Sequence, residues 1–191
     1  MSDTVSIRDI LDFWFLPLGH PDYGKKRELW WQSTPLLDDE IKARFGALVE
    51  LAVAGELDHW RKSPDGALAL TLLCDQFTRN IWRKTARAFS GDARARETAR
   101  LAVARGYPLV YPVEMRTFFY MPFQHSESLG DQEFCCSLFA GTGNDDYVKY
   151  AVEHRDIVAR FSRFPHRNEV LDRASTAEEL DYLKTAKRFG Q

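Results

Sequence analysis

A carboxylate and a guanidinium interrupt an otherwise apolar helix predicted to begin at Pro64. Asp75 and Arg79 are four residues apart, so they share one helix face and can form an ion pair. The opposite side is apolar up to Phe77, which predicts an interior helix, where an unpartnered carboxylate would be costly. Asp75, Arg79 and the following Asn80 therefore either form a structural pair at a helix crossing or face an internal polar cavity.

His154 lies in the middle of the apolar arc of a helix predicted over residues 146–162. Histidine titrates near neutral pH and can donate, accept or ligate, so an inward-facing imidazole is a candidate for proton transfer or ligand contact. The alternative is a core histidine that hydrogen-bonds a neighbour. We expect His154 and Asp75 to converge on one cavity if they belong to a single site.

The segment 121–127 places an imidazole, a hydroxyl and a carboxylate directly after Pro122, where we expect a helix to be interrupted. His125 or Glu127 could act as a general base or a metal ligand, and Ser126 could simply cap the next helix. The two-residue spacing of His125 and Glu127 is unlike the H-E-x-x-H pattern of zinc sites, so we expect no metal.

The densest basic stretch runs from 155 to 168, with four arginines and one acid. Guanidinium groups bind carboxylates and phosphates in a bidentate manner, so an anionic small molecule or a peptide carboxylate is a reasonable ligand. The alternative is a solvated basic helix end. No signature of an RNA- or DNA-binding module accompanies the stretch, and we expect no nucleic-acid partner. Its candidate binding residues are Arg160, Arg163, His166, Arg167 and Asn168.

Composition excludes several classes of protein. The 191 residues include 26 basic and 28 acidic side chains, so no overall field recruits nucleic acid or anionic membranes. The longest nearly apolar run, 67–74, is too short to cross a bilayer, and the first residues lack a secretory pattern. The three cysteines, Cys74, Cys135 and Cys136, form no disulfide framework. We expect a cytoplasmic protein with no membrane association.

Helix signals recur along the chain, and strand signals are nearly absent. Serine or threonine caps, several followed by proline, predict helices beginning near residues 6, 34, 63 and 90, and a capping box is predicted at Ser175 and Glu178. Further helices are predicted over 112–120, 129–140 and 146–162. We expect a single all-α domain over residues 1–191, with eight or nine helices stacked as antiparallel hairpins. The residue pattern of tetratricopeptide repeats is not visible.

Four motifs in this order resemble a bacterial family known as domain of unknown function 924. They are Asp12 to Phe15, Asp75 to Asn80, Met121 to Glu127 and Arg160 to Asn168, and the resemblance spans Ile7 to Arg173. It implies a tetratricopeptide-like helical fold and leaves activity, substrate and cofactor open. The chain departs from the family pattern at Thr78, where proline is common, and at Ser162, where glycine is common. Thr78 lets the helix continue, and Ser162 makes a tight turn harder to form.

Two functional hypotheses of different classes follow, together with a structural one. The favoured hypothesis is a binding module whose internal polar pocket takes a small anionic ligand or a peptide. The alternative is a hydrolase or transferase in which His125 or His154 is the base and Asp75 or Glu127 orients it. No nucleophile motif, phosphate loop or dinucleotide-binding pattern supports the second, and no cofactor is expected. In the third, the polar motifs only pack helices together. Homo-oligomerisation is compatible with all three.

Overall fold

Helices account for every regular element in the part of the chain that the computed structural model describes, residues 5–32 and 34–186. No strand occurs among these residues, and each helix between residues 92 and 161 packs against the next one along the chain, so the predicted all-α class of stacked hairpins is confirmed. The helices are α1 (Ile7–Phe15), α2 (Pro35–Ala54), α3 (Pro64–Thr71), α4 (Thr78–Ile81), α5 (Asp92–Ala104), α6 (Val113–Gln124), α7 (Leu129–Ala140), α8 (Asp145–Phe161) and α9 (Ala177–Leu183).

The helix starts follow the local chemistry of the sequence. Ser6 and Asp9 form a capping box at α1, and Thr34 and Ser63 cap α2 and α3, each followed by proline at the first helical position. Two predicted starts are wrong. The capping box at α9 is Thr176 with Glu179, one residue later than expected, and α5 begins at Asp92 with Gly91 rather than Ser90 as its cap.

Pro122 does not interrupt the helix that contains it. α6 continues through this proline to Gln124, contrary to the prediction. Proline removes one intrahelical hydrogen bond, but its fixed φ is helical. The neighbouring Phe119 and Phe123 are fully buried, so packing on the core holds the last turn in place.

α3 and α4 are two ends of one continuous helix joined by a π-helical turn at Leu72–Phe77. Such widened turns are rare and frequently occur at functional sites. Side chains satisfy the backbone in this turn: the Thr78 hydroxyl donates to the Cys74 carbonyl at 2.9 Å, and Arg79 donates to the Asp75 carbonyl at 2.6 Å. The helix thus continues through Thr78, as expected for a chain that lacks proline there.

Aromatic side chains fill the core between α1, α2, the π-helical turn and α6. Trp14, Phe45, Phe77 and Phe118 are fully buried, and their rings meet at tilted or edge-on angles with centroids 5 to 6 Å apart. Pairs of this geometry stabilise a core beyond the area they bury. The Asp75 side chain therefore lies at the edge of a rigid aromatic core.

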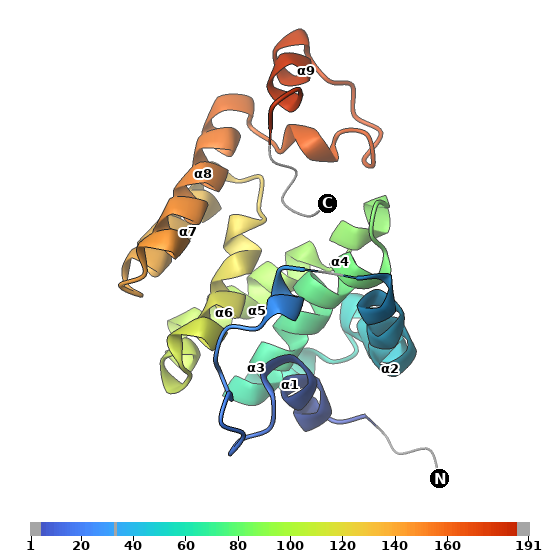
Figure 1. Cartoon of the computed structure of the whole chain (residues 1–191), viewed down its shortest axis with the longest axis vertical. Coiled ribbons are helices and arrows are strands. Elements are labelled where there is room, and N and C mark those ends of the chain that lie inside the picture. The colour runs from blue at the N-terminus through green and yellow to red at the C-terminus, as the bar shows by residue number, and fades with distance from the viewer. Residues whose placement is uncertain (1–4, 33, 187–191) are drawn as a thin grey trace.

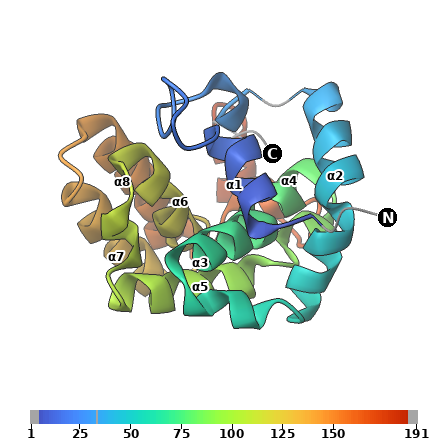
Figure 2. The same cartoon turned by 90° about the horizontal axis from the view of Figure 1, so that it is seen from below.

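The C-terminal segment lies at one end of the long axis of the molecule, away from α1 and α3 (Figure 1). α7 and α8 pack side by side and flank α6, while α3 and α5 lie together beneath α1 (Figure 2). After α8 the chain turns back at Ser162, which adopts the left-handed conformation with φ of 57°. The tight turn therefore forms despite serine, and it directs residues 163–173 toward the end of α6.

Candidate functional site

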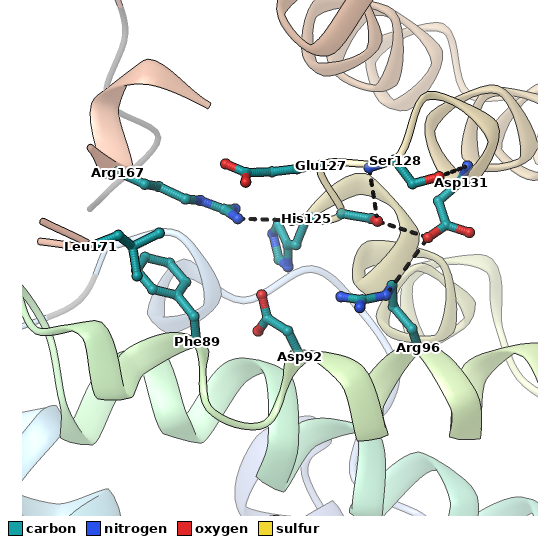
Figure 3. Close-up of a pocket in the computed structure, with 10 residues that line it drawn as sticks. Phe89, Asp92, Arg96, His125, Glu127, Ser128, Asp131, Arg167 and Leu171 are labelled. Carbon is teal, nitrogen blue, oxygen red and sulfur yellow. Dashed lines mark hydrogen bonds and ion pairs between the residues drawn. The ribbon is translucent and has the colours of Figure 1, made fainter. Parts of the chain in front are cut away.

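A pocket of about 390 Å³ opens where the end of α6, the starts of α5 and α7, and the C-terminal segment meet. Figure 3 shows Asp92 and Arg96 on α5, His125 at the end of α6 and Arg167 on the C-terminal segment, all around the same hollow. Its walls are Phe89, Asp92, Arg96, His125, Ser126, Glu127, Ser128, Asp131, Arg167 and Leu171.

His125 and Asp75 are in direct contact although fifty residues separate them. His125 Nδ1 lies 2.8 Å from Asp75 Oδ1 and 3.0 Å from Oδ2, and Asp75 is only 1% exposed. The turn that carries His125 is held by Gln132 of α7, whose buried amide donates to the carbonyls of Gln124 and Ser126 at 2.7 and 2.6 Å. Hydrogen bonds from both sides therefore fix the imidazole.

Arg79 connects Asp75 to a second carboxylate, Asp92. Arg79 Nη1 lies 3.1 Å from Asp75 Oδ1 and 3.0 Å from Asp92 Oδ1, which confirms the predicted i,i+4 ion pair. Asp92 comes this close because Gly91 sits against the π-helical turn, where a Cβ would lie 2.2 Å from the Cys74 carbonyl oxygen. Two carboxylates thus share one arginine.

These charges determine the protonation of the pair. Burial alone would raise the pKa of the Asp75 carboxyl, but Arg79 and the contacts with His125 and Gln76 hold it well below its usual range. Burial, together with Arg79 and Arg167, lowers the pKa of His125 despite the adjacent Asp75. His125 is therefore neutral at pH 7, and because Nδ1 faces an ionised carboxylate, that nitrogen carries the proton. Nε2 is left as the acceptor.

Arg167 is a buried cation with no acidic partner among the described residues. It is 4% exposed, and its guanidinium carbon lies 4.8 Å from the ring centroid of Phe89 and 4.4 Å from that of Phe164. Its hydrogen bond is to the His125 carbonyl at 2.9 Å, and its buried Nε has no partner. Burial and the nearby Arg79 lower its pKa to about 10, so it remains charged at pH 7.

The other two acids in the pocket wall are paired with arginines. Glu127 forms a two-pronged ion pair with Arg173, at 2.7 and 3.0 Å, and also accepts the Phe164 amide. Asp131 accepts from Arg100 at 2.5 Å and from the Ser126 hydroxyl at 2.7 Å. Glu127 therefore anchors the C-terminal segment and does not contact either candidate histidine.

His154 does not line the pocket, and neither does Asp75, so the expectation that both face one cavity is not met. His154 Nδ1 lies 2.8 Å from the Tyr150 carbonyl oxygen, and the ring packs on Phe164. The Gln124 amide lies 3.3 Å away. Burial lowers the pKa of His154 to about 3, which keeps it neutral in the interior. Asp75 is connected to the pocket wall through His125 and, by way of Arg79, through Asp92.

The remaining predicted residues contact four different partners. Asn80 donates to Asp38 at the start of α2, and Arg160 pairs with Glu178 at the surface. Arg163 and Asn168 both contact the carboxylate of Glu179, and His166 packs on Phe164. Of the eleven predicted residues, only His125, Glu127 and Arg167 line the pocket.

Sequence reasoning missed most of the remaining wall residues. Asp92 follows Gly91 at a helix start. A glycine there can mark a close contact between two backbone segments, but the sequence does not say which segment the glycine contacts. Phe89, Arg96, Ser128, Asp131 and Leu171 carry no motif that distinguishes them from surface residues.

Metal binding has no support in the described residues, where no group of three or more histidine, cysteine or carboxylate side chains could hold an ion. Nor does any described helix combine the length and apolar character that crossing a membrane requires. The chemistry available at the pocket is that of a neutral imidazole, a buried guanidinium and a set of carboxylates.

The fold and the site therefore define a class: an all-helical protein with a polar pocket where four segments meet. The family described as Bacterial protein of unknown function (DUF924) matches residues 10–187, and the chain belongs to this family. A solved structure of a protein of unknown function from Agrobacterium tumefaciens is similar, with 39% identity and a TM-score of 0.85 over 94% of this chain and 97% of that one. Among curated proteins no significant match was found.

Proposed function

We propose that the pocket binds a small molecule through an anionic group held by Arg167. The observation that carries this proposal is the burial of an arginine with no acidic partner among the described residues, in the wall of a cavity. Buried charges are normally paired, because an isolated one loses its hydration. A carboxylate or phosphate would supply the missing partner and the bidentate geometry that a guanidinium favours.

The size of the pocket favours a small molecule over a peptide. About 390 Å³ lies at the lower end of the range for small-molecule sites. The rings of Phe89 and Phe164 both contact the guanidinium, and the His125 carbonyl accepts from it, so it is already oriented before a ligand arrives. Pre-organisation of this kind reduces the entropy lost on binding.

The experiment is a thermal-shift screen of inorganic phosphate, phosphate monoesters and small carboxylates, followed by calorimetry. A ligand at 100 times its Kd stabilises the protein by about 2.7 kcal/mol. Arg167→Met should abolish the shift. Arg160→Met is the matched control, because that arginine pairs with Glu178 at the surface and should leave the shift intact. An unchanged shift in Arg167→Met would contradict the proposal.

A second candidate function is hydrolysis or group transfer with His125 as the base. The specific observation in its favour is the contact between Asp75 and His125, since a carboxylate on Nδ1 orients an imidazole whose Nε2 can accept a proton. Glu127 and His154 have no such role in this proposal, because Glu127 is paired with Arg173 and His154 lies outside the pocket.

This candidate is tested on any compound from the screen that the protein converts. His125→Gln should abolish turnover and leave the fold intact, whereas His154→Gln should retain turnover. Turnover that survives His125→Gln would exclude His125 as the base. If Asp75→Asn lowers stability and no compound binds or reacts, the purely structural interpretation of the polar motifs is the one that remains.

A further inference from the structure

Groups of opposite charge face the pocket from two different sides. Asp75 and Asp92 share the single cation Arg79, so this cluster carries one net negative charge when His125 is neutral. Arg167 carries one positive charge and forms no ion pair with any acid of the described residues, its hydrogen bond being to the His125 carbonyl. In Figure 3 the Asp92 carboxylate rises from α5 toward the hollow, and the Arg167 guanidinium enters it from the C-terminal segment.

The negative pole includes two acceptors on residues that line the pocket, Asp92 and His125. Asp92 Oδ1 is buried and makes no well-aligned hydrogen bond, although Arg79 lies 3.0 Å away. His125 Nε2 is a second acceptor, since Nδ1 donates to Asp75. A ligand that carries only an anion would satisfy Arg167, but it would bring a net negative charge next to Asp92. Such a ligand also offers nothing to these two acceptors.

We infer that the pocket binds a small zwitterion of the amino-acid class, with its carboxylate on Arg167 and its ammonium group toward Asp92 and His125. This inference rests on the proposed function, because it uses the same anchor. A zwitterion brings no net negative charge next to Asp92. It also supplies an anionic acceptor for Arg167 and a donor for Asp92 and for Nε2 of His125.

The test compares matched ligands on the unaltered protein by calorimetry. The twenty common amino acids, β-alanine and 4-aminobutanoate are each paired with the acid that lacks the amino group, for example alanine with propanoate. Charge-assisted hydrogen bonds are worth enough to predict that the best amino acid binds roughly tenfold or more tightly than its partner. The comparison of α-, β- and γ-amino acids then measures the spacing between the two poles.

Variants separate the two poles. Asp92→Asn should bring the amino acid and its deaminated partner to about equal affinity, while Arg167→Met should abolish binding of both. Asp156→Asn is the control, since this aspartate pairs with Arg155 on the surface of α8. Circular dichroism and the melting temperature report whether each variant is folded.

The outcomes of the two proposals are distinguishable. In one outcome, the deaminated acids or inorganic phosphate bind as tightly as every amino acid, and Arg167→Met lowers their affinity. The anion site then stands and the zwitterion inference is overturned. If no amino acid, carboxylate or phosphate binds, both proposals fail. If amino acids bind selectively and Asp92→Asn leaves this selectivity unchanged, the role given to the negative pole is overturned as well.

Discussion

Two sets of buried acids and arginines lie on either side of the turn at residues 125–128, and they differ in one respect. In the Glu179 cluster, the carboxylate is 1% exposed and accepts from Arg163 at 2.6 and 2.7 Å, from Asn168 at 3.3 Å and from the Thr176 amide at 2.8 Å. In the Asp75 cluster, two carboxylates share Arg79, and the wall residues Asp92 and Arg167 each keep a buried polar atom without a hydrogen bond.

The difference separates a structural network from a candidate site. Every strong acceptor of Glu179 is used within the chain, so that cluster fixes the C-terminal segment and leaves nothing for a ligand. Under the proposed function, a ligand completes the Asp75 cluster and Arg167. Substitutions in the first cluster should therefore change stability alone, and substitutions in the second should change stability and binding together.

The largest effect is expected for Arg79→Met. Removal of this arginine leaves Asp75 and Asp92 buried without a cation, and breaking a buried ion pair from one side costs about 3–5 kcal/mol. Chemical denaturation should show this loss of unfolding free energy. The additional substitution Asp75→Asn in the same chain should restore part of the stability, and a double mutant no more stable than Arg79→Met would contradict the assigned pairing.

Glu179→Gln tests the saturated cluster and should cost about 2 kcal/mol, the scale of hydrogen bonds to charged groups. Hydrogen bonds from Arg163, supported by the Thr176 amide, hold the pKa of Glu179 at about 2, compared with 4.5 when unperturbed. Its contribution is thus complete above pH 4.5 and is lost as the pH falls toward 2, because the unfolded chain takes up the proton first.

The measurement for Glu179 is the stability of both proteins between pH 7 and pH 2. The difference between the original protein and Glu179→Gln should shrink as the pH falls through this window. Affinity for any ligand of the pocket should stay the same in the variant at pH 7. A large change in affinity would mean that the two clusters are coupled.

Gly91→Ala tests the contact that brings Asp92 to Arg79. A Cβ at this position would meet the Cys74 carbonyl oxygen at 2.2 Å, so the start of α5 must shift away from the π-helical turn. Overpacking of this kind costs about 1–3 kcal/mol. Gly46→Ala in α2 is the control, since a Cβ there meets its nearest neighbour at 3.9 Å. Equal melting temperatures for the two variants would contradict the close approach.

Ser162→Gly should have the smallest effect and the opposite sign. Ser162 has φ of 57°, a conformation that glycine adopts without the steric cost that a side chain brings. Glycine also makes the unfolded chain more flexible, so the net gain should be at most about 1 kcal/mol. Thermal unfolding measures this gain, and a lower melting temperature would show that the serine side chain contributes an interaction of its own.

Much of the fold could be predicted from local signals, and part of the site could not. Caps and prolines located the starts of α1, α2 and α3, because these signals act within one helical turn. The tetratricopeptide-like arrangement stays a prediction. The i,i+4 spacing was sufficient to pair Asp75 with Arg79. The contact between Asp75 and His125 depends on how α6 crosses the π-helical turn, which no local pattern encodes.

Errors in the prediction have the same origin. The apolar arc of α8 correctly indicated that His154 is buried, but burial does not distinguish a histidine that faces Tyr150 and Phe164 from one at a cavity. Arg167 was one of several arginines in a basic stretch. Arg163 and Arg173 have carboxylate partners, whereas Arg167 lines the pocket. This difference among the arginines is visible only in the tertiary structure.

The turn at Ser162 has a consequence for the order in which the protein acquires its binding capacity during synthesis. Asp75, Asp92 and His125 are all in place once α3 to α7 have folded, but the guanidinium that completes the pocket belongs to the segment after α8. A nascent chain that has left the ribosome only as far as Phe161 therefore has the acceptors without the cation. Under the proposed function, ligand capture begins only when the returning segment docks on Glu127, so a bound ligand would report a finished fold.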